Sequence, residues 1–286
     1  MSMEISNTGL SAFIKTASIL NITAAAKELG ITQSALSQRI ALLEDALETT
    51  LFIREARGLK LTERGEKLLQ FALLNQKLEE EFLNDFKSSS VELAGTINLA
   101  GYSSVMRSVI IPALSPFLRK NPKIQISFQS YEMGELPNIL KTAKADIIFT
   151  DYLWEKNGII NHQCGHEKFV VIESTKFPSA TDIYLDHGPE DNATEEFFRH
   201  QSRSPKILRR SFMGDVYGII DGVEKGLGMA VMSKHLIAQN KAVTIKEGYK
   251  KYVRPVTMHY YDRPYFSKVM SRVLQELQKN CAHFLS

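Results

Sequence analysis

Residues 23–52, "TAAAKELGITQSALSQRIALLEDALETTLF", decide the fold of the first part of the chain. They predict two helices, at residues 24–29 and about 33–47, joined by a tight turn. Gly30 stands where a helix end that needs a positive φ favours glycine. Thr23 and Thr32 precede the two helices, and a threonine hydroxyl can accept a hydrogen bond from a free N–H of the first turn.

The second of these helices has two different faces. An apolar stripe recurs at spacings of four, three and four residues, made by Leu36, Ile40, Leu43 and Leu47. The opposite face carries small polar groups, Ser34, Ser37 and Gln38, flanked by Gln33 and Arg39. Such side chains let a helix approach base-pair edges closely and hydrogen-bond there. A plain αα-hairpin with an amphipathic second helix is the alternative interpretation.

The segments on either side extend this pattern. The preceding residues predict a helix with one apolar face, formed by Leu10, Phe13, Ala17 and Leu20. The following residues predict two short strands with Gly58 at their turn and a basic surface made by Arg54, Arg57 and Lys60. This is the layout of a winged helix-turn-helix, in which basic side chains of the wing reach phosphates or the minor groove.

This N-terminal segment resembles the LysR-type transcriptional regulators, a bacterial family. The resemblance rests on Leu10, Phe13, the run "TAAAKELGITQSALSQRIALLE", "LF" at positions 51–52, Arg54 and "LTERGEKLL". The chain departs from the family at Glu48, where many members have glycine, and at Ile22, where many have an aromatic residue. These two departures concern a turn and a packing position, so the DNA-binding interpretation stands.

The resemblance implies that the helix at residues 33–47 enters the major groove of DNA. The contacts it implies are Thr32, Gln33, Ser34, Ser37, Gln38 and Arg39 on the helix, and Arg54 and Arg57 on the wing. Residues 1–62 hold six Lys or Arg and six Asp or Glu. Phosphate binding should therefore depend on a few placed cations and on helix N-termini.

A long helix is predicted at residues 62–87, because no proline follows Gly65 there and apolar residues recur at threes and fours. The resemblance implies that this helix pairs with its copy in a second subunit through Leu68, Phe71, Leu78 and Phe82. It further implies that dimers pair into tetramers. Packing of the stripe on its own chain is the alternative, and "SSSVELAG" at residues 88–95 is the predicted hinge.

The remainder of the chain alternates predicted strands and helices. Apolar strands such as "GTINLAG", "KIQISFQS" and "ADIIFTD" are separated by helices, which indicates a parallel sheet with helices on its faces. The fold class is therefore α/β, with an all-α winged helix-turn-helix N-terminal domain. We expect a DNA-binding domain at 1–62, a linker helix and hinge at 63–90, and an effector-binding domain at 91–286. Its lobes should comprise about 91–162 with 255–286, and 163–254, as in periplasmic binding proteins. "GLGMAVMS" resembles a late motif of the family's effector-binding domain.

Ligands in such α/β folds bind beyond the carboxyl ends of the strands. That rule selects Ser103, Ser104, Ser130 and Thr150, and the start of a later helix adds Met213. Hydroxyls and free amides there suit a carboxylate or an amino-acid-like effector. Glu132 and Glu135 near one edge leave a cationic or zwitterionic effector open.

A different chemistry is suggested by "HQCGH", which places His162, Cys164 and His166 at alternate positions. On a strand they would share one face and could ligate a metal, so a metal- or thiol-responsive sensor is an alternative. A disulfide switch between Cys164 and Cys281 is another. A third alternative is a DNA-architectural protein without effector. The sequence contains no GxSxG, HExxH or Walker-type motif, so we expect neither an enzyme nor a cofactor.

The amino-acid composition and the first residues of the chain indicate in which cellular compartment the protein is expected. The two cysteines are too few for a disulfide framework, and neither a signal peptide nor a membrane span is evident, which favours the cytoplasm. The expected partners are double-stranded promoter DNA, a small-molecule effector and further copies of the chain, with RNA polymerase as a candidate and no membrane. A net charge of +3 does not decide between partners.

Overall fold

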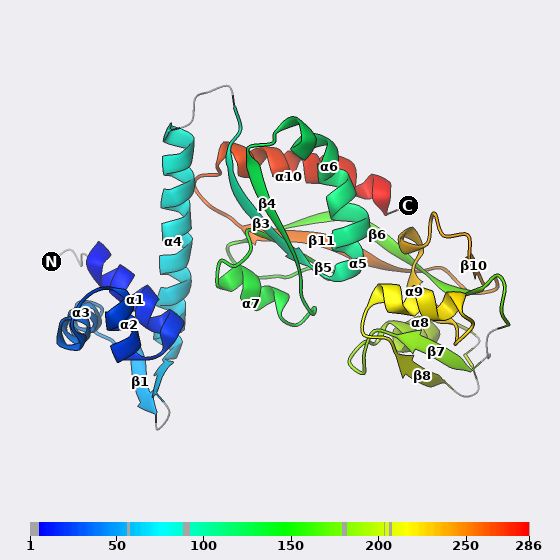
Figure 1. Ribbon diagram of the computed structural model, residues 1–286, viewed down its shortest axis with the longest axis horizontal. Helices are drawn as coiled ribbons and strands as arrows, with labels where there is room; N and C mark the ends of the chain where they lie inside the picture. Colours follow the sequence, from blue (N-terminus) through cyan, green and yellow to red (C-terminus); the bar gives the residue numbers. More distant parts are fainter. Residues whose placement is uncertain are drawn as a thin grey trace. The chain divides into compact units, whose positions relative to one another are not determined.

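The chain divides into two units, which are described separately. The computed structural model describes residues 6–55, 58–87, 92–178, 182–202, 204–205 and 208–285. One unit contains residues 1–87 with 141–144, and the other contains 88–140 with 145–286. We call them the N-terminal unit and the C-terminal unit (Figure 1). No helix among the described residues is long and apolar enough to cross a membrane.

The N-terminal unit contains short helices, a hairpin and one long helix, namely α1 (Asn7–Ile19), α2 (Ile22–Glu28), α3 (Gln33–Ala46), β1 (Phe52–Glu55), β2 (Gly58–Leu61) and α4 (Glu63–Lys87). The Thr32 hydroxyl caps α3 as predicted, accepting a hydrogen bond of 3.2 Å from the Ala35 N–H. The predicted cap of α2 is wrong. Asn21 rather than Thr23 accepts from the Ala24 N–H, at 3.0 Å, and the helix starts correspondingly earlier.

The helices α2 and α3 end in the same kind of hydrogen-bonded turn. After α2, Gly30 has a φ of 66°. The backbone N–H groups of Gly30 and Ile31 donate hydrogen bonds to carbonyls in the last turn of α2. After α3, Glu48 occupies the equivalent position with a φ of 49° and the equivalent two bonds. This is the Schellman arrangement, which favours glycine because a side chain is strained in the left-handed region. Glu48 therefore adopts the backbone of the glycine that it replaces.

The core of the N-terminal unit forms where α1, α2 and α3 meet the start of the hairpin. The predicted stripe of α3 is confirmed, with Leu36, Ile40 and Leu43 buried and Leu47 partly buried. Phe13 of α1 is fully buried and packs its ring 5.3 Å from that of Phe52. Leu20 does not join this face, because it lies beyond the end of α1 in a left-handed conformation and is 40% exposed.

The C-terminal unit is built on a seven-stranded sheet. Its order is β10-β6-β11-β5-β3-β4, with β9 paired to β6 off this path. The strands are β3 (Gly95–Gly101), β4 (Ile124–Ser130), β5 (Ile147–Thr150), β6 (Ile159–Ser174), β9 (Ala230–Ser233), β10 (Val243–Ile245) and β11 (Tyr252–Tyr261). β3 pairs in parallel with β4 and β5, as predicted, whereas β11 runs antiparallel to β5 and β6.

Helices cover the first lobe of this unit. They are α5 (Ser103–Val105), the π-helical turn η1 (Met106–Ile110), α6 (Ile111–Lys120), α7 (Leu136–Lys141), α10 (Lys268–Asn280) and the 3-10 turn η3 (Cys281–Phe284). α6 and α10 lie side by side over one face of the strands (Figure 1). Because α5, η1 and α6 follow one another without a gap, residues 103–120 form a single helical run that contains one π-helical turn.

The second lobe contains a small parallel pair and short helices, namely β7 (Ile183–Asp186), α8 (Ala193–Arg199), β8 (Arg209–Phe212), α9 (Val216–Glu224) and the 3-10 turn η2 (Lys234–Leu236). Two strands, β6 and β11, run from one lobe into the other, with Tyr252–Tyr261 paired against residues 159–169. The strand β6 reaches 16 residues because the whole of β11 pairs with it.

Candidate functional site

The first candidate surface is the outward face of α3. Thr32, Gln33, Ser34 and Gln38 are exposed, while Ser37 and Arg39 are half-buried. The first turn of α3 carries no acidic residue, so its free N–H groups and positive dipole end face outward without a competing carboxylate. The Gln33 side chain is held by the Thr23 hydroxyl, which donates to its Oε1 atom at 3.2 Å. This face offers hydrogen-bonding groups above a fully apolar underside.

The second candidate surface is the hairpin β1–β2. Arg54 is exposed on β1 and pairs with Leu59 across the hairpin. The hairpin is fixed to α3 by the Glu44 carboxylate, whose Oε1 atom accepts from the N–H groups of Leu51 and Phe52 at 2.6 and 3.2 Å. Arg57, the other basic residue predicted for the wing, lies outside the described residues.

The helix α4 carries the predicted apolar stripe. Leu68 packs partly buried against the core of the N-terminal unit, and Leu78 is half-buried. The aromatic residues of α4 are more exposed. Phe71 is 49% exposed and Phe82 is 50% exposed, and Phe86 is more exposed still. The hinge predicted at residues 88–95 falls largely outside the described residues.

The third candidate site is a pocket of about 730 Å³ between the lobes of the C-terminal unit. It opens where β3, β4 and β5 end, so Tyr102, Ser130 and Asp151 lie along one wall. The second lobe contributes the loop between β7 and α8, the start of α9 and the end of β9. Phe169 of β6 and Arg254 of β11 come from the strands that join the lobes. A concave site of this size between lobes suits a small molecule.

The structure brings three of the five predicted effector residues into this pocket. Ser103, Ser104 and Ser130 belong to its lining. Thr150 is fully buried behind it, and its hydroxyl lies 2.6 Å from the Nε2 atom of His259. Met213 packs instead into the core beneath α9.

A buried carboxylate links the two lobes at the pocket. Glu167 of β6 is 1% exposed. Its Oε2 atom accepts from the Tyr102 hydroxyl at 2.7 Å, and its Oε1 atom accepts from the Ser233 hydroxyl at 2.7 Å. The Nε2 atom of His235 lies 2.8 Å from the same Oε1, and the other ring nitrogen lies 2.7 Å from the Ser108 hydroxyl of η1. These contacts join residues of both lobes around one carboxylate.

A second link is made by Arg254 of β11. Its guanidinium donates to Asp151 at 3.1 Å in the first lobe, to Asn192 at 3.2 Å in the second, and to the Tyr252 hydroxyl at 3.0 Å. The Tyr252 hydroxyl and the Asp151 carboxylate help to raise the pKa of Arg254 against the opposing effect of burial. The group stays charged at all relevant pH values.

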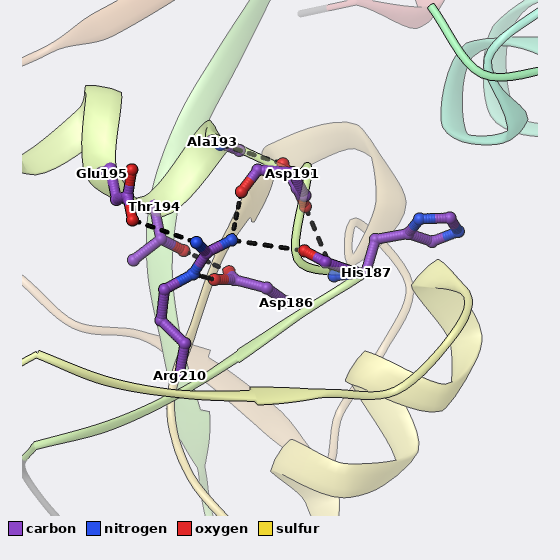
Figure 2. A network of polar contacts seen from close by, with 8 residues as sticks. Asp186, His187, Asp191, Ala193, Thr194, Glu195 and Arg210 are labelled. Atoms are coloured by element: carbon purple, nitrogen blue, oxygen red, sulfur yellow. Dashed lines mark hydrogen bonds and ion pairs between the residues drawn. The ribbon is translucent and has the colours of Figure 1, made fainter.

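The loop between β7 and α8 is shaped by Arg210 of β8 (Figure 2). Its guanidinium bonds the Asp186 carboxylate, the Glu195 carboxylate at 3.0 Å, and the carbonyls of Gly188 and Asp191. Thr194 donates to the other oxygen of Asp186. Burial raises the pKa of Asp186, and the bonds from Thr194 and Arg210 oppose that rise. The loop that lines the pocket is therefore held from behind by one side chain.

The "HQCGH" segment lies on β6, where a bulge interrupts the alternation. The pairing shifts between Val256 and Thr257, which leaves Cys164 as the extra residue. Cys164 is buried in the core, whereas His166 is exposed and lies 2.9 Å from the Gln163 amide. The expectation that the three residues share one face is therefore wrong. No group of three or more His, Cys, Asp or Glu in the described ranges is placed to hold a metal ion.

Sequence reasoning missed several residues of the pocket. The strand-end rule that selected Ser103 applies equally to β7 and would have found His187 and its loop. Glu167 had a signal as well, because a carboxylate beside the apolar run "FVVI" requires partners if it is buried. Arg254 and His235 carried no comparable signal, since their roles depend on how distant strands pair.

Comparison with known families matches both units. Residues 8–66 match the family model described as "Bacterial regulatory helix-turn-helix protein, lysR family". Residues 90–282 match the model described as "LysR substrate binding domain".

Two curated relatives are similar to this chain in sequence. The chain is 34% identical over 140 residues, 49% of its length, to the HTH-type transcriptional activator IlvY of Haemophilus influenzae. It is 26% identical over 205 residues, 72% of its length, to the activator TtdR of Escherichia coli. These matches span 48% and 62% of the relatives' own lengths.

The fold also agrees with a solved structure. The crystal structure of ArgP from Mycobacterium tuberculosis matches with a TM-score of 0.80 at 19% identity, covering 96% of this chain and 97% of that one. At this identity the likeness concerns the fold.

Proposed function

Because the chain belongs to the LysR family of bacterial helix-turn-helix regulators, we propose that it is a sequence-specific transcriptional regulator controlled by a small-molecule effector. The observation that carries this proposal is the outward face of α3, polar and free of acidic residues in its first turn, above a buried apolar stripe. That arrangement suits a helix that reads base edges in a major groove.

The roles proposed for single residues follow from their positions. Gln33, Ser34 and Gln38 are exposed and can reach base edges, and Thr32, Ser37 and Arg39 flank them. Arg54 on the hairpin can contact phosphate, and we assign the same role to Arg57. Since the charges of residues 1–62 balance, these contacts should carry much of the affinity.

We assign residues 1–62 to DNA binding, 63–90 to the linker and 91–286 to effector binding. Phe71 and Phe82 of α4 are each about half exposed, and burial against a second copy of the helix would remove that apolar area from water. A dimer would place two α3 helices for two half-sites of one operator. Pairing of dimers, and contact with RNA polymerase, extend the same proposal.

The effector site is the pocket between the lobes. A ligand there would contact both lobes and would favour the lobe arrangement that it binds more tightly. The hydroxyls of Ser103, Ser104 and Ser130 in the lining suit the carboxylate of an amino-acid-like molecule.

DNA footprinting upstream of the chain's own coding sequence tests this function. We expect wild-type protein to protect a paired, roughly palindromic site. Gln33→Ala should weaken binding by about 1–3 kcal/mol and relax specificity at one base pair. Arg54→Ala should weaken binding to all sequences alike and lower the salt dependence by about one phosphate contact.

Matched substitutions far from this surface provide the controls. Gln278→Ala and Arg119→Ala change exposed residues of α10 and α6 and should leave the footprint unchanged. Absence of a protected site upstream and across the genome would refute DNA recognition. A footprint that no metabolite alters would instead favour a DNA-architectural role without effector.

A further inference from the structure

The pocket between the lobes has a strongly negative lining. From the first lobe and from β6 it receives four carboxylates, Glu132, Glu135, Asp151 and Glu167. The second lobe adds four more, Glu190, Asp191, Glu196 and Asp215. Among the described lining residues these eight face a single arginine, Arg254, and one histidine, His187. The chain as a whole carries a net charge of +3, so the negative charge of the pocket lining is opposite in sign to that of the whole protein.

Two of these carboxylates are paired with an arginine, because Asp151 and Glu196 form ion pairs with Arg254 and Arg199. Two more lie near a histidine, with Glu167 at 2.8 Å from His235 and Glu132 at 3.9 Å from His187. Asp191 and Asp215 are held by backbone N–H groups, which orient a carboxylate without supplying a compensating full charge. The hydrogen bonds to Asp215 lower the pKa of its carboxyl, which keeps it ionised. A recess lined by like charges concentrates its field and attracts counter-ions.

The single lining arginine is already committed. All three nitrogens of the Arg254 guanidinium have partners, in Tyr252, Asp151 and Asn192. Arg210 supports the acidic loop from behind, and Arg107 stacks 3.5 Å over the Tyr217 ring outside the lining. An anionic ligand would therefore meet seven carboxylates besides the enclosed Glu167, without an uncommitted arginine among the described lining residues to offset them.

The other lining groups also suit a cation. Tyr102, Tyr131, Phe169 and Tyr252 contribute aromatic rings to the pocket. Aromatic faces attract ammonium and guanidinium groups, and Arg254 already shows this contact over Phe169 at 5.3 Å. The volume of about 730 Å³ lies within the range of roughly 300–1,000 Å³ that is usual for small-molecule sites.

We propose that the effector of this protein is a small organic cation whose ammonium or guanidinium group lies among the carboxylates of the pocket. This inference rests on the proposed function, because it names the ligand class of the same site. The acidic loop held by Arg210 supplies one side of that site, and Glu132 and Glu135 supply the other. A ligand that also bears a carboxylate would place it at Ser103, Ser104 and Ser130, away from the acidic loop.

Calorimetric titration of the full-length protein with matched probes tests the charge requirement. Lysine and norleucine differ in the terminal ammonium, and lysine and cadaverine differ in the carboxylate. Glutamate serves as the anionic probe. We expect lysine, cadaverine or both to bind at least about tenfold more tightly than norleucine and glutamate, and more weakly at high salt. The lysine–cadaverine comparison then separates an amino acid from a simple amine.

Substitutions in the pocket locate the binding. Glu132→Gln together with Glu190→Gln removes two exposed carboxylates from the lining and should weaken cation binding at least about fivefold. Glu247→Gln changes an exposed carboxylate outside the lining and should have no effect.

Tighter binding of norleucine or glutamate than of both cations, or no binding of either cation at millimolar concentration, would overturn the proposal. So would equal binding by the pocket variant. The footprint without added ligand is independent of these results, so failure here is distinguishable from failure of the DNA-binding function.

Discussion

The Tyr102 hydroxyl donates a hydrogen bond of 2.7 Å to the buried carboxylate of Glu167, and this bond joins the end of β3 to the strand that leads into the second lobe. Burial, and then the charge of Glu167, raises the pKa of Tyr102 well above its ordinary value. The hydroxyl therefore remains protonated, and a donor, at neutral pH.

Tyr102→Phe should destabilise the C-terminal unit. The change leaves one oxygen of a buried carboxylate without its donor, which costs roughly 1–3 kcal/mol. Urea unfolding followed by the fluorescence of Trp154, the single tryptophan, measures the loss. Tyr131→Phe is the matched control, because its hydroxyl bonds Gln129 at a partly exposed position and its removal should cost less. Equal losses would mean that the Glu167 contact carries no special weight.

Stability should fall in mild acid because of His259. Burial lowers the pKa of this imidazole to about 4. Its Nδ1 atom lies 2.7 Å from the side-chain amide oxygen of Asn161, so Nδ1 carries the proton, and its Nε2 atom lies 2.6 Å from the Thr150 hydroxyl. In the unfolded chain the pKa is about 6.5. Below pH 6.5 the imidazole is protonated in the unfolded chain but not in the folded one. The free energy of unfolding therefore falls as the pH falls, until about pH 4.

This loss should reach at most about 3 kcal/mol. Unfolding free energies measured between pH 7.5 and 4 for wild type and His259→Asn test it. The variant should be less stable at pH 7.5, where two hydrogen bonds are altered, and should lose less between pH 6.5 and 4. Parallel profiles for the two proteins would show that other groups control the acid sensitivity.

Two opposite substitutions should act on the turns after α2 and α3. Gly30→Ala places a side chain at a φ of 66° and should destabilise its turn by about 1 kcal/mol, although the space around it is open. Glu48→Gly relieves the same strain at a φ of 49° and should stabilise its turn by a smaller amount, since glycine also loosens the unfolded chain. Hydrogen exchange of the α2 and α3 amides measures both. If both substitutions lowered, or both raised, the stability of their turns, the two turns would not be equivalent.

The two cysteines should be unreactive in the folded protein. Cys164 and Cys281 are buried in the core of the first lobe. A hydrogen bond that the Cys281 thiol donates to the Cys164 sulfur, and then burial, raises the pKa of Cys281 above its ordinary range. Since the thiolate is the reactive form, labelling with Ellman's reagent should be slow until the protein is unfolded. Rapid labelling of native protein would revive the interpretation of the pair as a thiol switch.

The sequence was most informative where local chemistry decides the structure. The cap at Thr32, the stop at Gly30 and the apolar stripe of α3 depend on neighbours within a few residues, and each was predicted. The α4 helix agrees with the predicted span to within a residue.

The sequence was least informative where distant strands meet. The length of β6 and the bulge at Cys164 follow from pairing with β11, which lies about a hundred residues later. The contact between the Thr150 hydroxyl and His259 also depends on the pairing of distant strands. The rule that ligands bind beyond strand ends therefore could not show that Thr150 is buried behind the pocket. In the second lobe, Met213 sits one turn before α9 but faces the core, because Gly218 and Gly222 leave room for it.

The pairing of β6 with β11 has a mechanical consequence for how a ligand could be sensed. Both lobes share this two-stranded ribbon, and bending it within its own plane would break the hydrogen bonds that hold its strands together. Twisting the ribbon, or bending it out of its plane, breaks none. We therefore expect the two lobes to move relative to each other by twisting and out-of-plane bending of this ribbon, while its in-plane direction stays fixed.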